Sequence, residues 1–325
     1  MTIDLGVLKR WIGREQEFMD IVADQPVYAL SATLDRDDSI PRIGDPIMPG
    51  AHWLFFQEIV RNDDLGEDGH PGKAGFLPPV PLPRRMWAGG RLRFVKDLNI
   101  GDTVTRKSVI KNIKHKNTRA GDAVFVTVAH EIGDDHGIAV WEEQDIVYTP
   151  RPDRWDTPPV VHPRPAMPVW VRARKLNPVM LFRYSALTFN SHRIHYDHVY
   201  ATKEEGYAGL VAQAPLVATM LMHFTEHESE KKLKAFSFRV RAPIFAVESF
   251  EMEGLPDDRG DSAKVWAMTS ERGLAMEAEA DFDDGESINE EREEIAQHVD
   301  MSMEPTIDAT WEVPDGDETT DLDDT

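Results

Sequence analysis

The sequence contains no cysteine, and this absence removes three kinds of chemistry at once. Without cysteine there is no disulfide, no thiolate ligand for a metal and no cysteine nucleophile. The sequence also lacks an apolar run of the roughly 18 residues that a membrane span requires. Its first residues mix Asp4, Lys9 and Arg10 among apolar ones, unlike the unbroken apolar stretch of a secretory signal. We expect a soluble, cytoplasmic protein.

A basic stripe for nucleic acid is also lacking, although the net charge of −22 shows a strong imbalance. From Asp281 to the end there are 18 acidic residues and one basic residue, Arg292, whereas the preceding 280 residues hold 40 acidic and 35 basic residues. The acid is therefore gathered at one end and not spread over the surface, as it would be in a halophile. Residues 284–325 are also poor in apolar side chains, which predicts a mostly disordered tail with at most a short helix over Asn289–Gln297.

Glycine is not arranged in a phosphate-binding loop followed by lysine, so we expect no nucleotide cofactor. Proline, in contrast, crowds one stretch of the chain, at positions 150, 152, 158, 159, 163, 165 and 168. Such a stretch is typical of a stiff, extended linker. We predict a first unit over residues 1–150, a linker over 151–168, a second unit over 169–283 and the tail beyond it.

The two predicted units show the same pattern of strands and turns. Alternating apolar and polar residues around Gly-containing turns indicate antiparallel meanders. The predicted strands are 90–94, 124–132 and 138–148 in the first unit, and 235–240, 249–253, 263–269 and 274–282 in the second. Each meander follows a predicted helix, His52–Arg61 or Ala214–Thr225. A helix wrapped by a curved sheet, present twice, predicts an α+β double hotdog fold.

Histidine is concentrated in one segment of the second unit, Thr188-Phe189-Asn190-Ser191-His192-Arg193-Ile194-His195-Tyr196-Asp197. About twenty residues later, Gly209-Leu210-Val211-Ala212-Gln213-Ala214-Pro215 leads into the apolar helix. Together the two segments resemble the MaoC-like family of (R)-specific enoyl-CoA hydratases and 3-hydroxyacyl thioester dehydratases. That family has an Asp-x-Asn-Pro-apolar-His motif, and here Asn190 stands at the Asp position and His195 at the His position.

The branch with mesaconyl-C4-CoA and itaconyl-CoA hydratases is similar in more detail. It carries a similar Thr-Phe-Asn-x-His-x-Ile-His-Tyr-Asp run and a segment similar to Leu82-Pro83-Arg84-Arg85-Met86-Trp87-Ala88-Gly89-Gly90. The resemblance covers roughly residues 1–283. It implies an enzyme that adds water to an acyl-CoA thioester or removes it, most closely a hydratase that forms citramalyl-CoA.

Proton transfer is the chemistry that this reaction needs, and imidazole suits it at neutral pH. We expect His195 to be the acid/base. Asn190 can orient water through its amide but cannot take a proton from it. The backbone N–H of Ala214, at the start of a helix, is expected to polarise the thioester carbonyl.

The substrate-binding residues that we expect are His192, Arg193, Arg183, Gln213, Arg84 and Arg85, the arginines being suited to CoA phosphates or a substrate carboxylate. The first unit has no counterpart of the Asn190–His195 segment, so we expect it to shape the acyl pocket without catalytic residues of its own. The His-x-x-His spacing could suit zinc, but no acidic residue stands in ligand register, and we expect neither a metal nor a cofactor.

Three other functions stay open at this point. They are dehydration of a 3-hydroxyacyl thioester of fatty-acid type, thioester hydrolysis on a hotdog fold, and binding of acyl-CoA without catalysis. We expect no nucleic-acid or membrane partner, and a monomer or a homodimer of double-hotdog chains.

Overall fold

The computed structural model describes residues 3–72, 75–118, 121–151 and 161–283. The predicted tail, its short helix and most of the proline-rich linker lie outside these residues. None of the described helices is long and apolar enough to cross a membrane.

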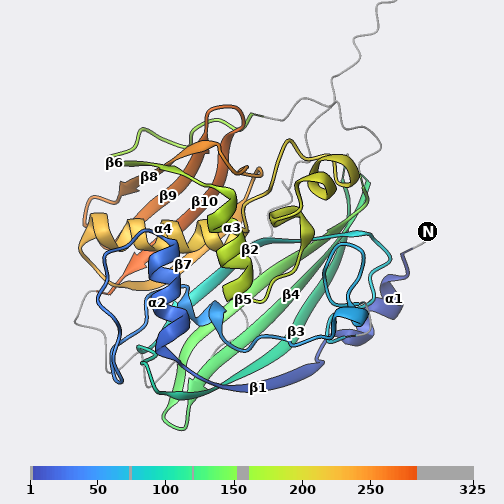
Figure 1. Ribbon diagram of the computed structural model, residues 1–325, viewed down its shortest axis with the longest axis horizontal. Coiled ribbons are helices and arrows are strands. Elements are labelled where there is room, and N and C mark those ends of the chain that lie inside the picture. Colours follow the sequence, from blue (N-terminus) through green and yellow to red (C-terminus); the bar gives the residue numbers. More distant parts are fainter. Residues whose placement is uncertain (1–2, 73–74, 119–120, 152–160, 284–325) are drawn as a thin grey trace, which may run out of the picture.

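Ten strands and four α-helices make up the described fold (Figure 1). In chain order the α-helices and strands are α1 (Leu5–Leu8), β1 (Glu15–Ile21), α2 (Asp24–Thr33), β2 (Arg84–Phe94), β3 (Thr103–Thr118), β4 (Gly121–Asp134), β5 (Gly137–Thr149), β6 (Trp170–Lys175), α3 (Pro178–Leu187), α4 (Ala214–Ser229), β7 (Leu233–Val240), β8 (Ser249–Pro256), β9 (Ser262–Thr269) and β10 (Gly273–Phe282). Short helical turns are η1 (Lys9–Trp11), η2 (Ala51–Leu54), η3 (Asn62–Asp64), η4 (Arg193–His195) and η5 (Tyr200–Glu204).

All ten strands belong to one antiparallel sheet, in the order β1-β3-β4-β5-β2-β7-β10-β9-β8-β6. The first five strands of the chain form one half and the last five the other, with the same relative order outward from the centre. The predicted meanders are confirmed, including the turns at 134–137 and 271–273. Figure 1 shows α2, α3 and α4 on the same side of this sheet.

The two halves join where β2 pairs with β7, with Gly89 opposite Arg239 and Gly90 opposite Phe238. A Cβ atom on Gly89 would lie 2.5 Å from the carbonyl oxygen of Phe238, and one on Gly90 would lie 3.0 Å from that of Glu143. Strands approach this closely only where the side chain is absent. The Gly-Gly pair therefore permits the central join, next to a bulge between Trp87 and Gly89.

Helix α4 is the central helix of the second half and confirms the helix predicted from Ala214. Pro215 lies in its first turn, where the missing N–H has no cost. Residues 216–222 and Phe224 are all buried, so this helix is apolar on nearly every side. It ends at Ser229, because Glu230 takes a left-handed conformation with φ of 57°.

The helix predicted over His52–Arg61 is wrong. Only the 3₁₀ turn η2 forms there, and Phe56 has a left-handed φ of 59° that stops a helix. Asp20 accepts the backbone N–H of Phe56 at 2.8 Å, a tertiary bond in place of a helical one. Leu54, Phe55 and Phe56 are buried in succession, which no single helical face allows.

Strand β3 was not predicted, although its 16 residues make it the longest strand described. Its pairing with β4 shifts between Ile110 and Asn112, so a bulge breaks the alternation that marks a strand. Val104 and Ile110 are buried at even-numbered positions, as expected for one face of a strand. Ile113, at an odd-numbered position beyond the bulge, is equally buried.

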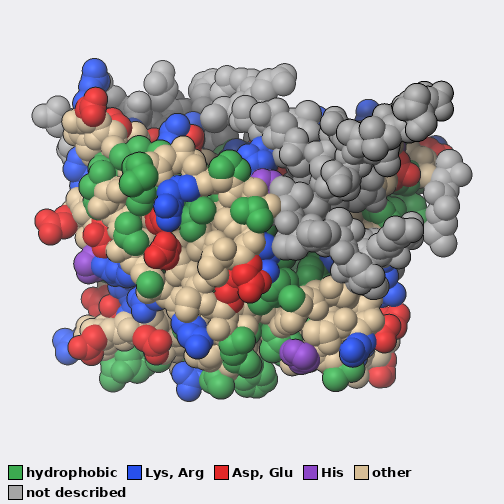
Figure 2. Space-filling view, turned by 90° about the horizontal axis from the view of Figure 1, so that it is seen from above, with side chains coloured by type: hydrophobic (Ala, Val, Ile, Leu, Met, Phe, Trp, Pro, Cys, Tyr) green, Lys and Arg blue, Asp and Glu red, His purple; other side chains and the backbone are tan. Residues whose placement is uncertain are grey.

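The described surface has a mixed charge. On the face that Figure 2 shows, basic and acidic side chains are interspersed and form no continuous basic stripe. This agrees with the nearly balanced charge of residues 1–280.

Candidate active site

The histidine-rich segment begins where α3 ends. Phe189 turns the chain with a left-handed φ of 50°, and the backbone N–H of Asn190 donates to the carbonyl of Ser185 at 2.8 Å. The Asn190 side-chain oxygen then accepts the backbone N–H of His192 at 3.0 Å. This bond holds the turn in shape and leaves the amide nitrogen of Asn190 and one lone pair of its oxygen available to a ligand.

His195 has a defined tautomer. Its Nδ1 lies 2.7 Å from the carbonyl oxygen of Val211, which can only accept a hydrogen bond. Nδ1 therefore carries the proton and Nε2 keeps a lone pair. The side chain is buried, and this burial lowers the pKa of His195 to about 4. At neutral pH His195 is an uncharged imidazole with one basic nitrogen.

The same contact places the start of α4 beside His195. Val211 also donates its N–H to the carbonyl of Ile194 at 3.0 Å, and Ala212 donates to Ile244 at 2.8 Å. Two residues later the helix begins at Ala214 without a side-chain cap. The free N–H groups at the start of α4 thus begin three residues after Val211, the residue whose carbonyl binds His195.

Gln213, which precedes the helix, is fully buried, and only the nitrogen of its side-chain amide has hydrogen-bond partners among the described residues. Its amide nitrogen donates to the Leu181 carbonyl and to the Ser185 hydroxyl, both at 2.9 Å. Its side-chain oxygen is buried and has no hydrogen-bond partner among the described residues. The amide nitrogen ties α3 to the start of α4, and the oxygen remains an acceptor for a donor that enters the site.

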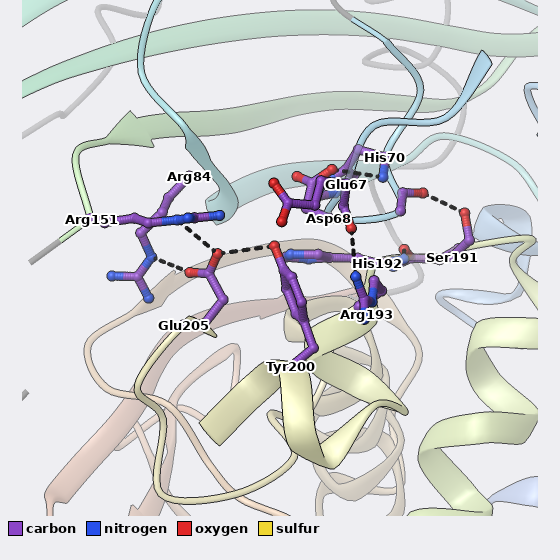
Figure 3. Close-up of polar contacts among 12 residues, drawn as sticks. Glu67, Asp68, His70, Arg84, Arg151, Ser191, His192, Arg193, Tyr200 and Glu205 are labelled. Carbon is purple, nitrogen blue, oxygen red and sulfur yellow. Dashed lines mark hydrogen bonds and ion pairs between the residues drawn. The ribbon is translucent and has the colours of Figure 1, made fainter. Parts of the chain in front are cut away.

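Two of the four expected arginines are committed to protein partners. Arg193 pairs with Asp197 at 2.8 Å and stacks on Tyr200 with its guanidinium carbon 4.1 Å from the ring centre. Arg84 pairs with Glu205 at 3.0 Å and donates to the hydroxyl of Tyr207. Figure 3 shows Arg84 and Arg151 both reaching Glu205, which also accepts a hydrogen bond from Tyr200 on its other side.

The other two arginines form no ion pair with a carboxylate among the described residues. Arg183 is exposed on α3. Arg85, in β2, is partly buried, and its charge helps to lower the pKa values of Asp68, His70 and His192. Arg85 hydrogen-bonds to Tyr148 but has no carboxylate partner among the described residues, and it lies close to the histidine-rich segment.

Sequence reasoning missed the loop of residues 67–70, which belongs to the first half. The ring of His70 lies 4.1 Å from that of His192, centre to centre, and the ring of His192 lies 5.3 Å from that of His195. Burial, then the neighbouring His70 and His195, lower the pKa of His192 well below its usual value. The only signal was the Asp68-Gly69-His70-Pro71 turn itself, some 120 residues from the segment that it contacts.

The structure thus brings His195, His192, Asn190, Gln213 and the start of α4 together, with Arg84 and Arg85 approaching from β2. A cavity of about 610 Å³ lies elsewhere, beside α2 and the end of α4. None of the expected site residues lines it.

Comparison with known proteins identifies the family. The family model described as hydroxyacyl-thioester dehydratase type 2 matches residues 50–246. The chain belongs to this family. It is also 40% identical over 268 residues to the mesaconyl-C(4)-CoA hydratase of Chloroflexus aurantiacus, covering 82% of this chain and 95% of that protein. The expected resemblance is confirmed, and with it a hydro-lyase that acts on acyl thioesters.

Two solved structures confirm the fold. A MaoC-like dehydratase from Phytophthora capsici has a TM-score of 0.60 at 13% identity and covers 87% of this chain and 99% of its own. A Mycobacterium tuberculosis protein described as a double hotdog has a TM-score of 0.52 at 11% identity and covers 83% and 96%. The sheet with its two matched halves is therefore a double hotdog.

Proposed function

We propose that this protein hydrates a short, branched, dicarboxylic enoyl-CoA, mesaconyl-C4-CoA or itaconyl-CoA, to citramalyl-CoA. The observation that carries the proposal is the position of a neutral His195, with a free Nε2, beside the uncapped start of α4. The relative from Chloroflexus aurantiacus, which carries this activity in its name, supports the choice of substrate.

His195 is the acid/base in this proposal. Hydration requires a group that exchanges a proton with the substrate. A neutral imidazole can accept a proton at Nε2, and the lowered pKa of His195 makes its imidazolium release that proton readily. The bond from Nδ1 to Val211 fixes which nitrogen is basic and where it points. Asn190 cannot share this work, because an amide does not take a proton.

The N-terminus of α4 receives the thioester carbonyl. As water adds at Cβ, negative charge develops on the carbonyl oxygen, and the N–H of Ala214 is expected to donate to it. One such donor is typically worth about 2.7–4 kcal/mol in the transition state. Gln213 offers its unpartnered oxygen to a hydroxyl or a water in the same place.

Arg85 is our choice for the free carboxylate of the substrate. A guanidinium binds a carboxylate through two parallel hydrogen bonds, but only if a protein carboxylate has not already taken that position. Arg84 and Arg193 are already paired in this way, whereas Arg85 is not. Arg183, on the surface, suits the phosphates of CoA.

The boundary between the two units is proposed to lie at residues 151–168, with the first unit over residues 1–150 and the second over residues 169–283. The protein is proposed to be cytoplasmic and to act as a monomer with two units or as a homodimer of such chains. The family description favours one alternative function, dehydration of a 3-hydroxyacyl thioester, which is the same chemistry in reverse.

The test is the loss of enoyl-thioester ultraviolet absorbance with mesaconyl-C4-CoA, itaconyl-CoA and crotonyl-CoA. We expect fast loss with a dicarboxylic substrate and none in His195→Gln. Arg85→Met should raise KM for the dicarboxylic substrate and leave KM for crotonyl-CoA unchanged, whereas Arg183→Met, which would affect only the CoA phosphates, should raise KM for all three substrates alike. Faster hydration of crotonyl-CoA by the parent would refute the dicarboxylic substrate, and release of free CoA with the double bond intact would point to a thioesterase.

A further inference from the structure

The loop of residues 67–70 is attached directly to the histidine-rich segment. The backbone N–H of Arg193 donates to the carbonyl of Asp68 at 2.8 Å, and the guanidinium of Arg193 donates to the carbonyl of Glu67 at 3.0 Å. The Ser191 hydroxyl donates to the carbonyl of Gly69 at 2.5 Å. Figure 3 shows the loop lying along residues 191–193. A piece of the first half thus forms part of the wall of the site.

His70 is held in this loop by a carboxylate. Its Nδ1 lies 2.8 Å from Oδ2 of Asp68, and Oδ1 of Asp68 accepts the backbone N–H of His70 at 3.0 Å. Burial alone would raise the pKa of Asp68, but the bonds and charge of His70 lower it to about 2. An ionised Asp68 can only accept, so Nδ1 of His70 carries the proton and Nε2 is basic. No described residue forms a hydrogen bond with this Nε2.

His70, His192 and His195 form a continuous series of neighbouring rings, which we name the imidazole row. Asp68, His70 and His192 each place one donor atom within 4.8 Å of the others, a spacing that could also hold a metal ion. Asp68 and His70, however, already use Oδ2 and Nδ1 for each other at hydrogen-bond distance. We therefore interpret the pair as a carboxylate–imidazole dyad, the arrangement that orients a base in many active sites.

We propose that Asp68 and His70 are the second proton-transfer group of this active site and take the place of the carboxylate that Asn190 does not provide. The inference rests on the proposed hydration. His195 lies beside the start of α4, where the thioester carbonyl and its neighbour Cα are held. His70 lies at the other end of the row, where the substrate extends to Cβ and the attacking water.

The step balances without any other reactant. An O–H bond of water breaks and its proton goes to Nε2 of His70, while the oxygen forms a C–O bond at Cβ. The electron pair of the double bond moves to Cα as an enolate, held by the N–H of Ala214. The proton leaves Nε2 of His70 again, passes by way of His192 to Nε2 of His195, and from there forms the C–H bond at Cα. Nδ1 of His70 and of His195 stays bonded to its protein acceptor throughout. All three imidazoles end neutral, and only water has been added.

The charges around the row suit this direction of transfer. Burial lowers the pKa of both imidazoles, to about 4 for His195, and at His70 the carboxylate of Asp68 acts against this effect. The titratable and charged groups that face His70 are Asp68 on its own loop, His192 and His195 from the second half, and Arg85 on β2. Arg85 opposes the charging of His70, and Asp68 is the only described carboxylate that favours it.

The experiment separates proton exchange at Cα from the addition of water. The hydrated product is incubated in D2O with the parent, His70→Gln, Asp68→Asn and His195→Gln, and both deuterium at Cα and enoyl-thioester formation are followed. The control is His115→Gln, another histidine of the first half, which pairs with Asp122 at 2.8 Å on the surface. Thermal unfolding of each variant checks that it folds.

We expect His70→Gln to keep the exchange at Cα and to lose about 10²–10⁴-fold in kcat for dehydration and hydration, with little change in KM. Asp68→Asn should lose less and should move the acidic limb of the kcat/KM profile to lower pH, because His70 loses the charge that stabilises its proton. His195→Gln should lose both reactions, and His115→Gln neither.

Two results would overturn the dyad. The first is a folded His70→Gln with the hydration rate of the parent, and the second is a folded His70→Gln that loses exchange and hydration together. An inactive parent would instead refute the proposed function, and the dyad with it. An active parent with an unaffected His70→Gln would refute the dyad alone.

Discussion

Gly69 lies so close to Ser191 that a Cβ atom on Gly69 would overlap with the Ser191 carbonyl oxygen. Gly69 also has a φ of 87°, which disfavours every other residue. The contact between the loop 67–70 and the histidine-rich segment therefore depends on the absence of one methyl group.

Gly69→Ala should separate the loop from the segment and lower kcat by about 10²-fold, the cost of a misplacement of about 1 Å. Gly44→Ala is the matched control, because Gly44 has the same φ of 87° and nothing within 4 Å of its added Cβ. Both variants should lose about 1–2 kcal/mol of stability from the left-handed conformation. Steady-state kinetics and thermal unfolding distinguish the two effects, and equal activities of the two variants would contradict the prediction.

The pH profile of activity should reflect the burial of His195. Its pKa is lowered to about 4, so the neutral imidazole that hydration requires persists well below the usual histidine value of about 6.5. Burial also lowers the pKa of His70, so the acidic limb of kcat/KM should have its midpoint below about 6.5 whichever of the two imidazoles sets it. A midpoint at or above that value, measured where circular dichroism shows the protein folded, would mean that a different group limits the reaction.

Stability should fall in mild acid for a related reason. Burial lowers the pKa of His130 to about 4 and that of His223 to about 3, whereas both regain about 6.5 when the chain unfolds. Below about pH 6.5 the unfolded chain binds more protons than the folded one, so the free energy of unfolding decreases from there towards about pH 4. Urea unfolding at several pH values measures this slope.

His223→Gln should make that slope shallower, because it removes one such proton while keeping a donor in place of Nε2 of His223, which lies 3.0 Å from the carbonyl oxygen of Pro49. An unchanged slope in this variant would exclude His223 as a source of the acid sensitivity.

Glu205→Gln should destabilise the protein by about 3–5 kcal/mol, the cost of leaving a buried partner charge unpaired. The Glu205 side chain is 5% exposed and pairs with Arg84 at 3.0 Å. Glu251→Gln is the control, because Glu251 is about half exposed and meets Arg164 at 3.6 Å. Its removal should cost at most about 1 kcal/mol. Similar unfolding midpoints for the two variants would contradict a structural role for the Arg84–Glu205 pair.

Strands that flank a clear turn signal were predictable from the sequence, and those that depend on tertiary contacts were not. The strands over 124–132 and 138–148 are rich in apolar residues, flank the Gly-containing turn at 134–137 and were placed correctly. Strand β3 contains a bulge that resets its period, and His52–Arg61 has helical spacing but is diverted by the bond from Phe56 to Asp20. The local sequence pattern cannot reveal a hydrogen bond to a strand more than thirty residues away.

The residues of the candidate site likewise include some that the sequence could predict and some that it could not. His195, Ala214 and Gln213 lie in segments whose local pattern marks them, and the structure brings them together. His70 and Asp68 lie in a short turn without periodicity, and only the fold brings them to His192. The expectation of a first unit without catalytic residues followed from the search for a second copy of the motif, whereas the groups that we propose in the loop are of a different kind.

The pairing of β2 with β7 has a consequence for how this sequence can change. In a symmetric homodimer each residue occurs twice, once in each of two identical environments, and a substitution alters both. Here the two halves are different stretches of one chain, joined at Gly89 and Gly90. The loop 67–70 contacts a single partner segment, so a substitution in the loop alters one contact only. Substitutions in the first half and in the second half can therefore change the same active site independently of each other.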